Sequence, residues 1–311
     1  GFSVSENNYM GKGIKLRSSL RFSGDSVKGQ FSILNPNYNY TNKSLFTNVQ
    51  STATDKLANN GYKSNKTGFN IGTKFEQYED FYFNPSISSF YEKLTTSTSA
   101  TSALRKQEGS NFDTSFNYAL DYDKRNQRYM TTEGFRSNFS QKIPLISKVY
   151  SLGNSYELNL YNKLPNDMVT NISFYASAIN SLSDKDVRIS DRLKLSANQL
   201  KGFESSKIGP VDNGDFIGGN FASAINLSTT LPMFLQSIDT ADISYFIDMG
   251  NVWGVDYSSE VDESNILRSS TGVLVNWFTP IGPLNFSLSH PISQASSDAT
   301  QVFQFNLGTT F

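Results

Sequence analysis

The chain of 311 residues lacks cysteine altogether and contains a single histidine, His290. Without cysteine, the protein can form no disulfide, no thiolate nucleophile and no cysteine-ligated zinc site. The charges nearly cancel, with 27 Lys and Arg residues against 28 Asp and Glu residues, so no overall field attracts a polyanion. We therefore predict no metal centre, no cofactor, no catalytic residues and no nucleic-acid partner.

Long apolar runs are missing too, and none approaches the roughly 18 residues that a membrane helix needs. The chain also does not start with a basic segment followed by an apolar one. We therefore expect any signal peptide to have been removed and Gly1 to be an internal cut. If the protein spans a membrane, it must cross with β-strands.

The sequence is instead rich in aromatic side chains, and apolar and polar residues alternate strictly along parts of it. Phe and Tyr are abundant, with 24 and 16 copies, in a chain otherwise rich in Ser, Thr and Asn. Apolar and polar residues alternate along 284–289 and again along 303–307. A period of two places successive side chains on opposite faces of a sheet, and the segments are about ten residues long, enough for a tilted strand to cross a bilayer.

These patterns predict an all-β fold, a transmembrane antiparallel β-barrel with about fifteen strands that occupies residues 1–311 as one domain. Trp253 and Trp277 are expected in the aromatic girdles at the membrane surfaces. Turn residues are found at 10–13, 23–25, 132–134 and 280–283, and the polar stretches 51–66 and 95–111 are predicted to be exposed loops.

Alternation fails between Asp184 and Ile217, a stretch that is too long for a hairpin turn. It contains several apolar residues, so we expect it to pack against something. The nearest surface is the inside of the barrel. The sequence thus predicts that Ser196 to Gly214 folds into the lumen.

The segment 199–210 resembles a loop of BamA-superfamily barrels that carries a Val-Arg-Gly-Phe tetrad. In this chain the tetrad is represented by Leu200, Lys201, Gly202 and Phe203. Further blocks match the family in order, namely Asn8–Gly13, Tyr122–Arg125, Ile217–Asn220, Phe246–Trp253, Phe278–Leu284 and Phe303–Phe311. The resemblance covers essentially the whole chain, with three departures. A lysine replaces the arginine of the tetrad, Ser228 stands where the BamA branch has a carboxylate, and the proline usual in the hairpin at Asp123 is replaced near Thr131 or Thr132.

The resemblance implies a sixteen-stranded barrel of the bacterial outer membrane, preceded by periplasmic POTRA domains. It implies a lateral seam between the first and last strands, where strands of other proteins enter the bilayer. The early turn at Met10–Gly13 resembles the one that closes the family's second strand, so the first strand is expected upstream of Gly1. The implied partners are unfolded outer-membrane protein clients, outer-membrane lipid and, through the POTRA domains, accessory periplasmic lipoproteins.

Lys201 and Asp248 are the candidate pair that holds the lumen loop. Alternation puts Asp248 on the face opposite Tyr245, hence toward the lumen if Tyr245 faces lipid. Family order favours an ion pair within about 4 Å, although a solvated lysine and a water-facing aspartate are the common alternative. Phe203 is expected to anchor the tip of the loop. Gly250, in the same family block as Asp248, belongs to this candidate anchoring site.

The end of the chain carries the other candidate residues, the seam and C-terminal signal, which are Phe303, Phe305, Leu307, Gly308 and Phe311. Gly308 weakens strand pairing because it has no side chain to pack, and the resemblance suggests that it loosens the seam. Phe311 resembles the terminal signal by which barrels are recognised for assembly. The strand 301–311 is expected to have a full neighbour on one side alone.

The function predicted first is the insertion of other β-barrel proteins, with no enzymatic reaction. A two-partner secretion or translocation-and-assembly transporter of the same superfamily is the alternative, and a passive porin is a third. A Ser-His hydrolase at His290 is rejected, because no acid at a recognisable spacing would orient the histidine. The turn 212–215 offers at most a weak cation site.

Overall fold

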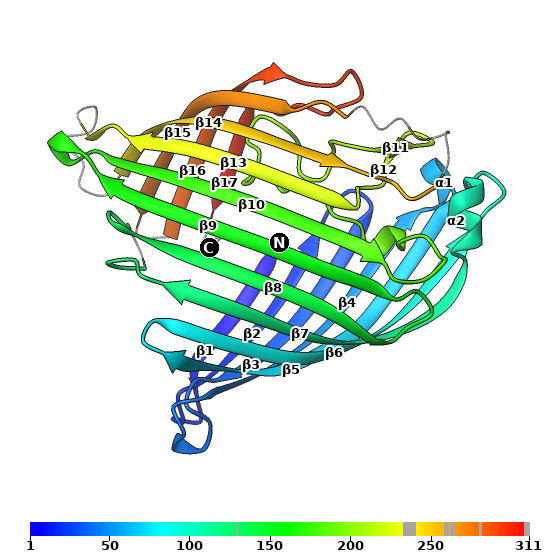
Figure 1. Ribbon diagram of the computed structural model, residues 1–311, viewed down its shortest axis with the longest axis horizontal. Coiled ribbons are helices and arrows are strands. Elements are labelled where there is room, and N and C mark those ends of the chain that lie inside the picture. The colour runs from blue at the N-terminus through cyan, green and yellow to red at the C-terminus, as the bar shows by residue number, and fades with distance from the viewer. Residues whose placement is uncertain (129, 233–240, 258–260, 262–264, 280–281, 308–311) are drawn as a thin grey trace.

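The computed structural model describes residues 1–128, 130–232, 241–257, 261, 265–279 and 282–307. It contains one 15-stranded antiparallel sheet in which neighbours in sequence are neighbours in space (Figure 1). Its strands are β1 (Phe2–Tyr9), β2 (Ile14–Phe22), β3 (Ser26–Asn35), β4 (Ser44–Lys56), β5 (Tyr62–Tyr78), β6 (Phe81–Thr96), β7 (Gly109–Asp123), β8 (Gly134–Ile146), β9 (Ser151–Lys163), β10 (Val169–Ser181), β13 (Phe221–Thr230), β14 (Ala241–Trp253), β15 (Arg268–Thr279), β16 (Gly282–Ser293) and β17 (Phe303–Leu307). The predicted fold class and strand number are confirmed.

The remaining elements are short and lie in the connections. They are the helices α1 (Leu57–Asn60) and α2 (Ser102–Lys106), the 3-10 turns η1 (Tyr38–Tyr40), η2 (Pro165–Asp167) and η3 (Ile189–Asp191), and the hairpin β11 (Val211–Asp212) with β12 (Asp215–Phe216). Among the described residues, no helix is long and apolar enough to cross a membrane.

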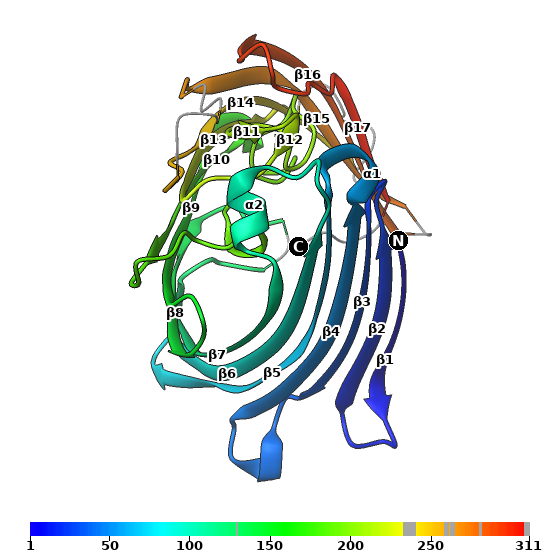
Figure 2. The same ribbon diagram turned by 90° about the vertical axis from the view of Figure 1, so that its right-hand side faces the viewer.

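The sheet curls into a ring, with β1 and β17 on the same side and α2 at the mouth (Figure 2). In the part of the chain that the structure describes, β17 pairs with β16, β1 pairs with β2, and neither has a second partner. One-sided pairing of the last strand is therefore found for residues 303–307. Gly308 and Phe311 lie outside the described residues, as do Pro280 and Ile281 of the predicted turn before β16.

The outer face of the sheet is apolar and the inner face is polar. In β16, the side chain of Leu288 is 61% exposed, whereas the neighbouring Ser287 and Ser289 are buried on the inner face. The same holds in β17, where Phe303 and Phe305 point outward and Gln304 points inward. This order is the reverse of that in a soluble β-protein, and it is the order expected of a barrel whose outside meets lipid.

The prediction that the two polar stretches, 51–66 and 95–111, are exposed loops is wrong. Residues 51–66 lie mostly within β4 and β5, which α1 joins. Their serines and threonines are compatible with a strand that has one face toward a wet interior, and threonine favours strands. In 95–111, α2 buries Ala103 and Leu104, so this connection packs against the molecule instead of projecting freely.

The outward-facing Ile225, in the middle of β13, tests the assignment of the outer face to lipid. We expect Ile225→Arg to lower the free energy of unfolding in lipid vesicles by about 2 to 4 kcal/mol, because an arginine near mid-bilayer loses its hydration. Ser140→Arg is the matched control, since Ser140 lines a cavity in the lumen, and its cost should be about 1 kcal/mol or less. Equal costs at the two positions would contradict the assignment.

Candidate functional site

The connection between β10 and β13, residues 182–220, is here named the lumen loop. It runs inside the curled sheet, and its β11–β12 hairpin reaches the rim beside α1 (Figure 1). Its apolar side chains form a buried cluster with the inner wall, made of Leu195, Leu200, Phe203, Ile208, Ala222, Ala224 and Val252. The predicted lumen position is thus confirmed for the tip, while the neighbourhood of Asn213 lies at the rim, where its side chain donates a hydrogen bond to the Ser99 carbonyl.

Lys201 contacts Asp248 at the tip of the lumen loop. The Nζ atom of Lys201 lies 2.9 Å from Oδ2 of Asp248, whose side chain is wholly buried. The backbone N–H of Lys201 donates to the same carboxylate oxygen at 2.9 Å. The ammonium group also lies 4.5 Å from the centre of the Phe246 ring, a distance at which a cation is attracted to the ring face. The predicted approach of these two side chains is confirmed.

Gly202 lets the loop backbone lie directly on the wall. Its φ is +90°, and a Cβ atom there would lie 3.1 Å from the Cβ of Ser270 and 3.3 Å from that of Ser289. The hydroxyl of Ser270 donates a hydrogen bond to the carbonyl of Lys201, which is possible only at this close approach. Gly250 has a similar effect from the wall side, because a Cβ on it would lie 3.0 Å from the side chain of Leu195.

Phe203 is buried, as expected of an anchor, and its backbone forms an isolated antiparallel bridge with Thr300. The side-chain amide of Gln304, in β17, donates to the carbonyl of Phe203 at 3.2 Å. The tip therefore touches the strand that ends the sheet. Of the other predicted seam residues, Phe305 packs its ring 5.2 Å from that of Phe286 on the outer face, and the backbone of Leu307 pairs with that of Leu284.

A second anchor holds the base of the lumen loop against the opposite wall. The carboxylate of Glu92, in β6, accepts hydrogen bonds from Nε of Arg188 at 3.0 Å and from the hydroxyl of Ser190 at 2.8 Å. Nearby, Lys66 of β5 donates to Asp191 at 2.8 Å. Two charges of the loop thus meet opposite charges of the wall in a partly dry space, where such bonds are stronger than at a surface.

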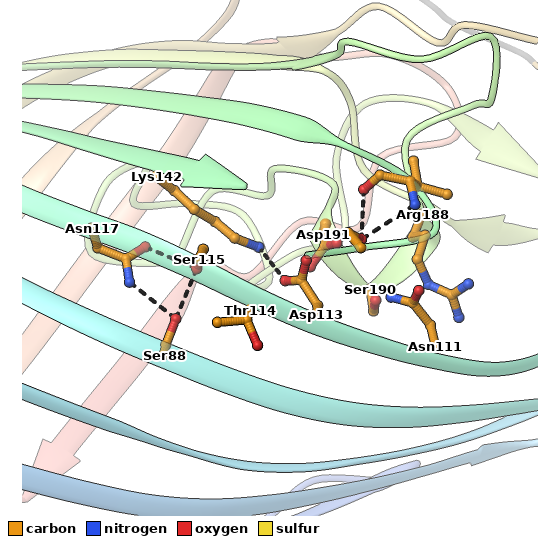
Figure 3. Close-up of polar contacts among 12 residues, drawn as sticks. Ser88, Asn111, Asp113, Thr114, Ser115, Asn117, Lys142, Arg188, Ser190 and Asp191 are labelled. Carbon is orange, nitrogen blue, oxygen red and sulfur yellow. Dashed lines mark hydrogen bonds and ion pairs between the residues drawn. The ribbon is translucent and has the colours of Figure 1, made fainter. Parts of the chain in front are cut away.

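The wall beside this anchor carries its own charge pair. Lys142 reaches from β8 to Asp113 of β7 at 3.0 Å, and Asp191 of the loop lies next to them (Figure 3). Burial alone would raise the pKa of the Asp191 carboxyl, but Lys66 and Lys142 outweigh it and hold that pKa below its usual value. The loop therefore remains anionic here at neutral pH.

The β11–β12 hairpin forms a third contact at the rim. Asp212 accepts hydrogen bonds from the hydroxyls of Thr101 and Tyr257, at 2.9 and 3.2 Å. Asp215 accepts one from Tyr62 at 2.8 Å and pairs with Lys56. Both carboxylates of the suggested cation site are thus bound to protein donors, and no group of three acidic or histidine side chains suited to a metal occurs among the described residues.

A fully buried pair, Arg268 with Asp298, and the contacts of Glu92 and Lys66 with the loop were not anticipated from the sequence. Alternation could have placed the wall residues on the inner face. It could not identify their partners, because these lie in segments where apolar and polar residues do not alternate. His290 lies in β16 with its side chain exposed, whereas Ser287 and Ser289 are buried on the inner face. These residues therefore do not form the Ser-His pair that a hydrolase needs.

Comparison with known proteins gives a consistent result. Residues 8–311 match the family model described as the Omp85 superfamily domain. The chain is 24% identical over 263 residues to the outer membrane protein assembly factor BamA of Neorickettsia risticii, covering 83% of this chain and 35% of that protein. It is 27% identical over 169 residues to the human sorting and assembly machinery component 50 homolog, covering 52% and 36%. The chain thus spans about a third of the length of these relatives.

Two solved structures share the fold. BamA from Haemophilus ducreyi lacking POTRA domains 1–3 superposes with a TM-score of 0.80 at 22% identity, covering 97% of this chain and 65% of that one. CdiB from Acinetobacter baumannii gives a TM-score of 0.60 at 11% identity, covering 98% and 55%. At these identities both likenesses concern the fold alone.

Gly202 and Gly214 provide a matched test of how the tip docks. Both have a positive φ, but a Cβ at Gly214 would meet nothing within 4 Å. Gly214→Ala should cost about 1 kcal/mol through backbone strain alone, and Gly202→Ala about 2 kcal/mol more because the wall is crowded. Trypsin should therefore cleave the folded protein after Lys201 and Lys207 faster in Gly202→Ala than in Gly214→Ala. Equal cleavage rates would show that the close approach does not hold the tip.

Proposed function

This chain belongs to the Omp85 superfamily, and on that premise we propose that it is the membrane barrel of a factor that assembles β-barrel proteins in the outer membrane. The barrel is an integral outer-membrane domain. The proposed activity is supported by a bacterial relative named as an outer membrane protein assembly factor and by a human relative named as a component of a sorting and assembly machinery. The proposed mechanism is strand templating without an enzymatic step.

The end of the sheet at β17 is where a client strand would enter. Strands in a bilayer need every backbone N–H and C=O group paired, because lipid offers no hydrogen bonds. Among the described strands, the outer edge of β17 has no partner. An extended segment of an unfolded outer-membrane protein can pair with such an edge, which gives affinity through the backbone and tolerates many sequences.

Strand length adds to this effect. The strands β1 to β3 have 8 to 10 residues, whereas β5 to β7 have 15 to 17. At about 3.3 Å per residue, these correspond to roughly 30 Å and roughly 50 Å along the strand. A shorter apolar belt next to the edge thins the surrounding bilayer and lowers the barrier to insertion.

The observation that carries the proposal is the docking of the loop tip, residues 201–203, against β14, β15 and β17. β17 is the last strand of this wall and the one that a client would meet. A docked loop tip therefore fixes the shape of the wall next to the client. A passive porin needs no such brace. A cavity of about 440 Å³ remains between the loop and the wall from β6 to β10, lined among others by Asn117, Ser140 and Ser177.

A transporter for two-partner secretion or for translocation and assembly is the alternative within the superfamily. The tetrad of secretion transporters commonly ends in tyrosine, whereas this chain has Phe203, which favours assembly. The number of POTRA repeats upstream separates these functions: five would favour the assembly factor, three the paralogue, two a secretion transporter and none a porin. Accessory periplasmic lipoproteins would bind through those repeats.

The Lys201–Asp248 pair tests the role of the docked tip. In the full-length protein, Lys201→Met and Asp248→Asn should each lower the initial rate of client insertion into vesicles about tenfold, because each leaves a buried polar group without its partner. The double variant should be no slower than either single variant. The coupling free energy is then about 1.4 kcal/mol.

Lys207→Met is the control for this experiment, since Lys207 lies in the same loop but forms an exposed pair with Glu204. It should leave the insertion rate unchanged. The exchanged pair, Lys201→Asp with Asp248→Lys, should recover part of the activity only, because a lysine at 248 cannot accept the backbone N–H of residue 201. Strictly additive effects of the two single substitutions would argue against a role for the pair in insertion.

A further inference from the structure

Residues 294–302, here named the β16–β17 connection, fold inward and are tied to the wall by a buried ion pair. Arg268 of β15 donates from Nε and Nη2 to the two carboxylate oxygens of Asp298, at 2.9 and 3.0 Å. Both side chains are 0% exposed. A third nitrogen, Nη1, donates to the side chain of Asn251 at 2.6 Å and to the carbonyl of Ile266 at 3.0 Å. The guanidinium group is thus bound on every side.

Asp298 also shapes the connection itself. Its Oδ2 atom accepts the backbone N–H of Ala295 at 2.6 Å, and its own N–H donates to the carbonyl of Ala295 at 3.1 Å. One carboxylate therefore closes a tight turn and binds that turn to β15. Removing the charge would weaken both constraints together.

The shaped connection pairs with the tip of the lumen loop through backbone hydrogen bonds. Glu204 donates its N–H to the carbonyl of Ala299 at 2.9 Å, and Ala299 donates to the carbonyl of Lys207 at 3.1 Å. Gln301 donates to the carbonyl of Gly202 at 2.9 Å. These bonds surround the bridge between Phe203 and Thr300, so the loop and the connection form a short ladder.

The ladder runs directly into the last strand. The carbonyl of Val302 accepts the N–H of Ser289 at 2.8 Å, and β17 begins at the next residue. Only Gln301 and Val302 separate the bridge at Thr300 from Phe303. The edge strand cannot swing away from β16 without either breaking this ladder or carrying the loop tip with it.

We propose that Arg268 and Asp298 are positioning residues for insertion, which hold the β16–β17 connection in the shape that pairs with the lumen loop. Through this pair the loop tip and the edge strand β17 move as one unit. The link to insertion rests on the proposed function, whereas the coupling of the two segments does not. The pair touches no client; it acts through the ladder.

The Arg268–Asp298 pair can hold the connection in one shape because it is buried, whereas an exposed pair could not. Burying two charges away from water costs free energy, so the pair is stable only in a geometry in which each charge is bound by the other. Removing one partner leaves the other charge buried and unpaired. The exposed pair of Lys207 and Glu204, at 51% and 41% exposure, is hydrated with or without its contact. A planar guanidinium with two parallel bonds also fixes direction, which a lysine would not.

Hydrogen exchange measured by mass spectrometry on the full-length protein in vesicles tests the coupling. In Asp298→Asn, amides of both 294–302 and 199–207 should exchange at least about tenfold faster, while those of β5 to β7 stay unchanged. The double variant Arg268→Met with Asp298→Leu removes both charges and keeps the barrel foldable, and it should show the same paired loosening. Arg268→Lys, which keeps the charge but not the fork, should fall between these and the wild type.

Lys66→Met is the matched control, since it removes the loop's charged partner on the opposite wall. It should speed exchange around Asp191 and leave 294–302 unchanged. Faster exchange in 294–302 with an unchanged 199–207 would overturn the proposal, as would unchanged exchange in both segments. The insertion rate is measured in parallel: coupled loosening with normal insertion would remove the positioning role, whereas a wild-type protein without insertion activity would refute the proposed function and leave the coupling standing.

Discussion

Backbone hydrogen bonding in the absence of water is the constraint on which this structure depends. A sheet in lipid must pair every N–H and C=O group, so the strands curl round into a ring and the pairing problem is confined to the edges. The lipid outside the barrel also reverses the order of side chains found in a soluble β-protein, with Leu288 and Phe303 outside and Ser287 and Gln304 inside. A polar lumen follows, and a polar lumen can hold a loop that carries charges.

The lumen loop spans that interior as a brace between opposite walls. Its tip is bound at Asp248 on one side, and its base is bound at Glu92 and Lys66 on the other. Buried ion pairs of this kind contribute little net stability, because desolvation offsets most of the attraction. They act on geometry instead, because the charges of the loop find their partners in one position of the loop in the lumen. Lys201 binds Asp248 through both its ammonium group and its backbone N–H, and both contacts are to the same carboxylate oxygen, Oδ2.

The edge of the sheet and the brace are joined by the β16–β17 connection. The buried pair of Arg268 and Asp298 holds that connection, the ladder at Phe203 and Thr300 links it to the loop, and β17 starts three residues later. In the arrangement that we propose, the position of β17 is therefore set by contacts inside the barrel.

The sequence by itself determined the class of fold, the facing of most strand residues and the identity of the loop. A period of two is a local property, so it placed Asp248 and Tyr245 on opposite faces without any tertiary information, and the family resemblance then favoured Lys201 as the partner of Asp248. Local patterns gave the wrong prediction for 51–66, where a polar segment predicted to be a loop is mostly strand. Serine and threonine suit a strand face toward a wet lumen as well as they suit a loop. The tertiary structure alone decided the partners of Glu92 and Arg268. Their partners lie 96 and 30 residues away in segments without a period, and only the curl of the sheet brings such segments to the wall.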